Sequence, residues 1–169
     1  LTGLISGLQI DPGKTIALVG GDVVLEGGAI TSNGGKIEIG SVGKDSLVRL
    51  NRQENWSLSY ENARTFQDIK LVERFDEVLS PLFGFLLPST INVNSLNGSS
   101  GEIKMQGRSL FVDGSQISLL SQDATLSGNL TINASETVDL INDSFTAGGL
   151  QSTLASGTIA EGNAGNIVI

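Results

Sequence analysis

Short β-branched triplets, each bounded by glycine, asparagine, aspartate or serine, recur along the whole chain. The segments that carry this pattern are 15–21, 22–28, 35–40, 101–107, 129–133 and 166–169. Within each segment, apolar residues two positions apart share one face of a strand, and their polar neighbours face the other way. Evenly spaced short strands broken by turn residues are typical of a β-solenoid. The pattern therefore predicts an all-β chain built by stacking, in which most residues serve the architecture.

The composition agrees with a narrow, coiled sheet. Glycine is abundant at 22 residues, aromatic content is only 5%, and 39% of the residues are hydrophobic. A β-sandwich core would normally use more aromatic side chains. The hydrophobic content is nevertheless sufficient for a packed core, which argues against a disordered chain.

The spacing of the repeats predicts how the coils stack. Ile103 and Leu130 are 27 positions apart, and Leu110 and Val138 are 28 positions apart. Coils of about 20–30 residues predict roughly six to eight coils, and hence a rod on the order of 30–40 Å long. Glycine and asparagine at the bends allow the left-handed or bulged backbone that the corners need.

We expect one β-helical domain over 1–169 that is a segment of a longer protein. The chain starts at Leu1 without an initiator methionine or a charged leader, and it stops at Ile169 inside a strand pattern. Residues 1–74 carry the first rungs, 75–90 interrupt the pattern as a short apolar insertion, and 91–169 carry further rungs.

Charge and missing residue types exclude several functions. The net charge of −8 argues against nucleic acid or an anionic membrane as partner, because the ten basic residues are scattered. The chain has no cysteine and no histidine. It therefore has no disulfide, no thiolate zinc site and no histidine-dependent triad, and we expect neither a cofactor nor a metal site.

The insertion contains the most apolar window, from Val78 to Leu87. Pro81 and Gly84 break this window, which is too short to span a bilayer. We expect a short helix or loop that packs on the flank or covers a sheet edge. The alternative is a patch that docks a partner or touches a membrane surface. The side chains exposed in that case would be Leu82, Phe83 and Phe85.

Trp56 and Tyr60 are four positions apart in a strand-like pattern and therefore share a face. Exposed aromatic rings on a flat β surface can stack on sugars. The favoured interpretation is packing at a bend or under the 75–90 insertion, and sugar stacking is the alternative.

Acidic residues are plentiful in the second half of the chain, at Asp113, Asp123, Glu136, Asp139 and Asp143. Glycoside hydrolysis requires two carboxylates about 5–10 Å apart. Most of these residues occupy turn positions, where aspartate satisfies local backbone donors. We therefore expect no enzymatic activity, with a carbohydrate-active enzyme as the alternative.

Several runs resemble the filamentous-haemagglutinin family of large exoproteins, especially its cyanobacterial members. They are GLQIDPGKTIALVGGDVVLEGG at 7–28, GGKIEIGSV at 34–42, GEIKMQGR at 101–108, and the segments 113–117 and 162–169. The resemblance extends over nearly the whole chain apart from 75–90. It implies a right-handed parallel β-helix that is exported by two-partner secretion through an outer-membrane β-barrel transporter.

The resemblance implies a structural and adhesive segment that is secreted or displayed at the cell surface, with cell-surface glycans or proteins as candidate partners. The family's transporter-recognition motif, Asn-Pro-Asn, is absent, and Asn-Pro occurs nowhere in the chain. No residue here therefore inherits the recognition role. A secretion module that engages the transporter remains an alternative, and no part of the chain is expected to span the membrane.

Overall fold

The computed structural model describes residues 7–52, 56–76, 85–95, 98, 101–122, 127–141, 151–159 and 161–169. All regular secondary structure in these ranges is β-strand, which confirms the all-β class, and no helix there is fit to cross a membrane. The strands are β1 (Gly7–Ile10), β2 (Thr15–Gly20), β3 (Val23–Glu26), β4 (Ala29–Asn33), β5 (Lys36–Ser41), β6 (Leu47–Asn51), β7 (Ser57–Asn62), β8 (Ile69–Val72), β9 (Arg74–Asp76), β10 (Phe85–Leu87), β11 (Thr90–Asn94), β12 (Glu102–Asp113), β13 (Gln116–Ser121), β14 (Leu130–Ile141), β15 (Thr153–Thr158) and β16 (Ile167–Val168).

Five parallel strands form face A, in the order β1, β4, β11, β13 and β15. Neighbours in this face are far apart in sequence. Ala29 pairs with both Gly7 and Thr90, and Gln116 pairs with both Thr90 and Thr153. The chain thus leaves face A after each strand and returns to it one strand further along.

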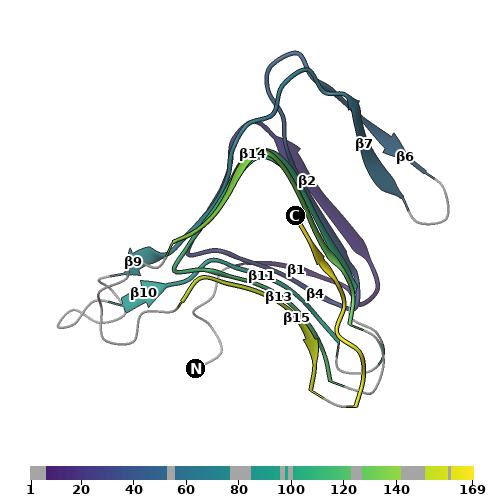
Figure 1. Ribbon diagram of the computed structural model, residues 1–169, viewed down its shortest axis with the longest axis vertical. Helices are drawn as coiled ribbons and strands as arrows, with labels where there is room; N and C mark the ends of the chain where they lie inside the picture. Colours follow the sequence, from purple (N-terminus) through teal and green to yellow (C-terminus); the bar gives the residue numbers. More distant parts are fainter. Residues whose placement is uncertain are drawn as a thin grey trace.

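Two further parallel faces complete the arrangement. Face B consists of β2, β5, the first halves of β12 and β14, and β16. Face C consists of β3, β8 and the second halves of β12 and β14. The register of β12 with β14 shifts between Gly107 and Ser109, and an irregularity of this kind bends a strand. The three faces outline a triangle when viewed along the stack (Figure 1).

The spacings of 27 and 28 positions noted in the sequence are confirmed, because the residues concerned are paired across neighbouring strands. Ile103 pairs with Leu130 on face B, and Leu110 pairs with Val138 on face C. Both pairs join β12 to β14 in parallel, so one excursion of the chain returns to face B after 27 positions and to face C after 28. The repeat length read from the sequence therefore sets which strands become neighbours.

The inward positions of the three faces form one apolar core. Ile37 and Ile39 of β5 are fully buried and pair with Ile103 and Met105 of β12. Other inward positions hold Ile69, Leu71, Ile91, Val93, Leu110, Val112, Ile117, Leu119, Leu130 and Ile132. Burying one such side chain stabilises the folded state by about 1.5–3 kcal/mol. The predicted alternation of apolar and polar positions is thus what separates the core from the surface.

Buried serines satisfy backbone groups where the chain turns between faces. The Ser41 hydroxyl is placed to donate a hydrogen bond to the carbonyl oxygens of Gly21, at 2.7 Å, and of Asp68, at 3.0 Å. The Ser89 amide donates to the Ser115 hydroxyl at 3.1 Å. Glycines also serve the bends, with positive φ at Gly13, Gly27, Gly34, Gly98 and Gly114. The serines were not predicted, because their role depends on burial and not on backbone freedom.

Residues 47–50 and 56–60 lie within the 1–74 stretch that was expected to carry the first rungs, but they do not form rungs. These residues form β6 and β7, which pair antiparallel as a hairpin between β5 and β8. Their alternating pattern is genuine, but their partners are each other and not the faces. The following segment, β8, does belong to face C.

The chain departs from the three faces a second time near 75–90. The described residues at the two ends of this interruption form strands and not the helix or loop expected there. β9 and β10 pair antiparallel, with Phe85 opposite Asp76 and Leu87 opposite Arg74. Residues 77–84 lie outside the described ranges. Among the described residues, face A has five strands, which is fewer than the six to eight coils estimated. Part of the difference is that β6 and β7, which the estimate assigned to coils, pair with each other.

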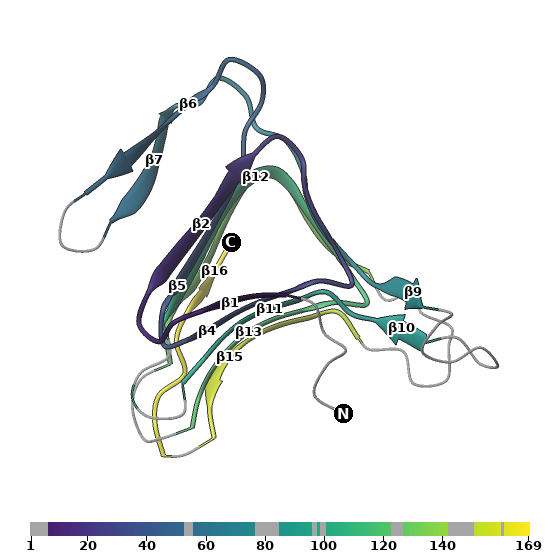
Figure 2. The same ribbon diagram turned by 180° about the vertical axis from the view of Figure 1, so that it is seen from behind.

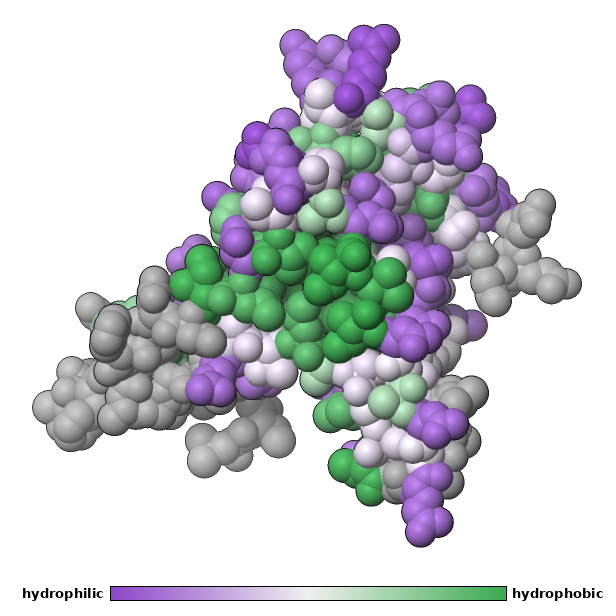
Figure 3. Space-filling model, viewed as in Figure 1, coloured by the Kyte–Doolittle hydropathy of each residue, from purple (hydrophilic) through white to green (hydrophobic). Residues whose placement is uncertain are grey.

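The stack has two open ends. Figure 2 looks onto the end formed by β1 and β2, and Figure 1 onto the end formed by β14, β15 and β16. At the second end, the inward residues Leu140 and Ile167 are exposed, and apolar surface gathers at its centre (Figure 3). At the first end, Leu8 and Leu18 are exposed. Each end therefore presents core side chains next to a strand edge that no other described strand pairs with.

Candidate functional site

The β6–β7 hairpin lies beside the outer side of face B (Figure 1). Its base is closed by an antiparallel bridge between Val42 and Phe66 and by a hydrogen bond from the Gly43 amide to the Thr65 carbonyl, at 2.8 Å. The chain thus leaves the stack after β5 of face B and rejoins it at nearly the same place, just before β8 of face C. The hairpin is an addition to the outer side of the sheet.

The outer side of face B carries a chain of ion pairs. Lys36 Nζ lies 3.2 Å from Glu38 Oε2 and 3.5 Å from Glu102 Oε2, and Lys104 Nζ lies 3.2 Å from Glu102 Oε1. Two lysines and two glutamates therefore balance one another. The parallel register of β5 and β12 places these charges side by side.

Glu38 is the buried member of this group, with its side chain only 3% exposed. Its Oε1 accepts a hydrogen bond from the Leu58 amide of β7, at 3.2 Å. Its Oε2 lies in the ion pair with Lys36 but receives no hydrogen bond from the described residues. The carboxylate therefore ties the hairpin to the sheet.

Tyr60 of β7 packs directly on Gly40 of β5. A β-carbon at Gly40 would overlap the Tyr60 ring and hydroxyl. The ring also lies 6.3 Å from Phe66, centroid to centroid, in a tilted arrangement. The hydroxyl is buried and has no hydrogen-bond partner among the described residues. Burial, and secondly the Glu38 carboxylate, raise the pKa of Tyr60 far above its ordinary value, so the phenol stays a neutral donor.

A groove of about 250 Å³ follows the line where the hairpin meets face B. Leu58 and Tyr60 form its wall on the hairpin side. On the sheet side its polar lining residues are Glu38, Lys104, Gln106, Thr131 and Asn133. An aromatic and aliphatic wall next to a few convergent polar groups is typical of a small-ligand site.

The predicted site residues have different outcomes. Tyr60 lies in the groove, packed on Gly40 and not under the 75–90 insertion. Trp56 is half-buried just before β7 and is not among the residues that line the groove. Phe85 begins β10, but its side chain is not described. Leu82 and Phe83 lie outside the described ranges, so the predicted docking patch stays a prediction.

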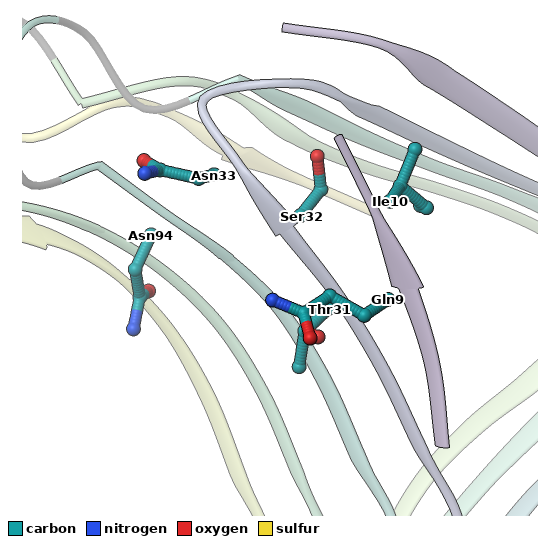
Figure 4. Close-up of a pocket in the computed structure, with 6 residues that line it drawn as sticks. All are labelled: Gln9, Ile10, Thr31, Ser32, Asn33 and Asn94. Atoms are coloured by element: carbon teal, nitrogen blue, oxygen red, sulfur yellow. The ribbon is translucent and has the colours of Figure 1, made fainter. Parts of the chain in front are cut away.

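A second recess, of about 210 Å³, lies at the end of face A where β1 stops (Figure 4). Ser32 occupies an inward position there, and its buried hydroxyl has no hydrogen-bond partner in the described part of the chain. The other lining side chains are those of Gln9, Ile10, Thr31, Asn33 and Asn94. The recess therefore combines neutral amides and hydroxyls with Ile10 and lacks an ionisable side chain.

The acidic residues considered for catalysis are spread over the structure. Asp139 lies opposite Phe111 and accepts a hydrogen bond from the Thr137 hydroxyl, at 2.9 Å. Asp113 ends β12, and one of its carboxylate oxygens is buried without a hydrogen-bond partner among the described residues. Glu136 lies in β14, and Asp123 and Asp143 fall outside the described ranges. In the ranges that are described, no three acidic side chains are grouped to hold a metal ion.

The shortest ion pair among the described residues was not predicted. Arg108 Nε and one terminal nitrogen each donate to a different carboxylate oxygen of Asp68, both at 2.8 Å. Hydrogen bonding to Arg108 is the main reason why the pKa of Asp68 is lowered. Asp68 and Arg108 are 40 positions apart, and only the register of β8 with β12 brings them together.

The residues that form the floor of the groove were also not predicted from the sequence. Gln106 and Asn133 are register partners on β12 and β14, and Lys104 is the partner of Thr131. The available signal was that all four occupy outward positions next to buried residues. No protein-family model, curated protein or solved structure matches the chain.

Proposed function

We propose that the chain is a right-handed parallel β-helix segment of a large, secreted or surface-displayed haemagglutinin-like exoprotein exported by two-partner secretion. Its role is structural and adhesive, and it is not catalytic. It forms a stiff shaft whose outer surfaces and hairpins contact cell-surface glycans or proteins. The outer-membrane β-barrel transporter is its partner during export.

The observation that carries this proposal is the common register of three parallel faces. Corresponding strands in each face follow one another in chain order, and the inward side chains stack on one another. A stack of this kind has no intrinsic limit of length, because each layer presents the same edge to the next. This property suits a shaft.

The two antiparallel hairpins support the adhesive part of the proposal. Both leave the faces and return to them, so they add side surfaces without interrupting the stack. Loops and projections on a rigid scaffold are the usual carriers of binding function. The groove beside β7 is the surface with the best-defined polar and aromatic lining.

The test is to identify the natural polypeptide by intact mass and peptide sequencing of protein from culture medium and cell surface. We expect a chain much larger than 17.6 kDa, with an Asn-Pro-Asn signal before Leu1 and more coils after Ile169. A mature surface protein of about 17.6 kDa that begins at Leu1 would contradict the exoprotein proposal.

The same material separates the alternatives. A carbohydrate-active enzyme would depolymerise a polysaccharide and lose that activity after a single change such as Asp113→Asn or Asp139→Asn. A secretion module would act only in transit, so its removal would block export. A shaft with an adhesive role would instead leave export intact and reduce attachment of cells to a surface.

A further inference from the structure

The floor of the groove beside β7 is made of uncharged hydrogen-bonding groups. Gln106, Thr131 and Asn133 are half-buried or exposed and point outward from face B. No hydrogen bond from the described residues reaches their side chains. Adjacent parallel strands are about 4.8 Å apart, so Gln106 and its register partner Asn133 present two amides at that spacing. Such amides can donate to and accept from hydroxyl groups on one ligand.

The wall of the groove supplies apolar surface. Leu58 and Tyr60 face the floor, and packing on Gly40 and Phe66 holds the Tyr60 ring in place. A fixed ring loses little conformational freedom when a ligand binds. The Tyr60 hydroxyl is buried against Gly40, so the groove is lined by the apolar part of this side chain.

Electrostatics select the charge of the ligand. Both charged residues of the lining, Glu38 and Lys104, already form ion pairs with Lys36 and Glu102. An anionic ligand would therefore find no unpaired positive charge in the groove lining, and the chain as a whole carries a net charge of −8. A cation would have to compete with lysine for each carboxylate. A neutral ligand meets neither obstacle.

The size of the groove limits how much of a ligand it holds. Its volume of about 250 Å³ lies below the range of about 300–1,000 Å³ typical of pockets that enclose a whole drug-sized molecule. The groove is open along the sheet, so a longer ligand can extend from it. One ring of a longer chain fits these limits.

We infer that this groove binds one residue of a neutral, hydroxyl-rich oligosaccharide, with its apolar ring face against Leu58 and Tyr60 and its hydroxyls on Gln106, Thr131 and Asn133. The inference rests on the proposed adhesive role and names the ligand class of that role. It assigns the groove, and not the exposed rungs in general, as the place of recognition.

The test uses the full 169-residue chain and isothermal titration with cellohexaose, maltohexaose and mannohexaose, with oligogalacturonate as the anionic comparison. Binding variants are Gln106→Ala, Thr131→Ala and Asn133→Ala. The matched control is Gln116→Ala, which removes the same side chain from an outward position on face A. Far-UV circular dichroism of each variant checks that the sheet is intact.

We expect at least one neutral hexasaccharide to bind more tightly than oligogalacturonate. Each binding variant should weaken that affinity about 3- to 10-fold, the effect of losing one net hydrogen bond, while Gln116→Ala leaves it unchanged. Absence of binding at millimolar concentrations, preference for the anionic sugar, or an equal loss in Gln116→Ala would each overturn the inference. None of these outcomes bears on the mass and sequence of the natural exoprotein, so failure here is distinguishable from failure of the proposed function.

Discussion

At the scale of single residues, close approach between layers decides which positions tolerate a side chain. Gly101 lies against Gly35, and a β-carbon at Gly101 would overlap the Gly35 carbonyl. That carbonyl accepts the hydrogen bond from the Glu102 amide, at 3.0 Å, so the two layers cannot separate freely. Gly21 is different, because nothing lies within 4 Å of a β-carbon there.

We therefore expect Gly101→Ala to lower the free energy of unfolding by about 3 kcal/mol, at the upper end of ordinary single substitutions. Urea unfolding followed by circular dichroism measures this. The control Gly21→Ala should change stability by no more than about 0.5 kcal/mol. Equal effects of the two substitutions would show that backbone freedom, and not layer contact, governs these glycines.

The ion pair of Asp68 with Arg108 makes stability depend on pH. Arg108 lowers the pKa of Asp68 in the folded state, so the unfolded chain binds a proton there more readily. The stabilisation is fully present above the ordinary aspartate pKa of about 3.9 and is lost as the pH falls through the lowered value.

We expect Asp68→Asn to be less stable than the parent chain at neutral pH, with the difference closing in acid. Urea midpoints from about pH 7 down to about pH 2.5 test this, because the change spans the ordinary aspartate pKa. Arg108→Lys keeps the charge but not the two parallel hydrogen bonds, so its stability at neutral pH should lie between those of the parent chain and Asp68→Asn. A difference that stays constant with pH would contradict a role for the charge.

At the scale of elements, the hairpin and the faces have separate partners. β5 and β8 keep their places through the parallel ladders with β12, whereas β6 and β7 pair only with each other. Leu58 and Tyr60 of the hairpin contact face B at Glu38 and Gly40. The faces therefore do not need the hairpin to stay paired.

Replacing residues 44–64 by a short Gly-Asn turn should leave the sheet folded, because Gly43 and Thr65 already lie within hydrogen-bond distance. We expect a loss of no more than about 2 kcal/mol in stability, since few hydrogen bonds are removed and the shorter loop costs less entropy to close. Circular dichroism shows whether the sheet is folded, and urea unfolding measures the loss of stability. Loss of the sheet signal would show instead that the hairpin is needed to form face B.

At the scale of the whole molecule, the ends and the middle of the stack differ. Strands β1 and β16 are largely exposed, whereas β12 pairs on both sides and buries its inward residues. Each layer depends on its neighbours, so opening an end layer disturbs fewer contacts than opening a central one.

Hydrogen–deuterium exchange should therefore show a gradient, with fastest exchange in β1, β2, β15 and β16 and slowest in β5 and β12. Mass spectrometry of peptic peptides from the full chain resolves this. The hairpin strands β6 and β7 should exchange faster than β5, because they form an isolated pair. Uniform protection across all layers would mean that the stack opens only as a single unit.

Local pattern was sufficient for the strands of the faces. Alternation of apolar and polar residues at 36–39 and 102–106 acts within one strand, so the sequence alone predicts which side chains face the core. The spacing of Ile103 from Leu130 likewise predicted their pairing. The same alternation at 47–50 and 56–60 was misleading, because a strand pattern does not say which strand will be its partner.

The sequence by itself determined an acidic, cysteine-free, all-β chain with inward ladders of isoleucine, leucine and valine. Only the tertiary structure decided which residues meet on the outside of the stack. Tyr60 and Gly40 are 20 positions apart, and Gln106 and Asn133 are 27 positions apart. Tyr60, Gln106 and Asn133 nevertheless line one groove, and Gly40 packs against Tyr60. The physical reason is that strand alternation is a local property, whereas a groove depends on register between distant strands and on where a hairpin settles on the sheet.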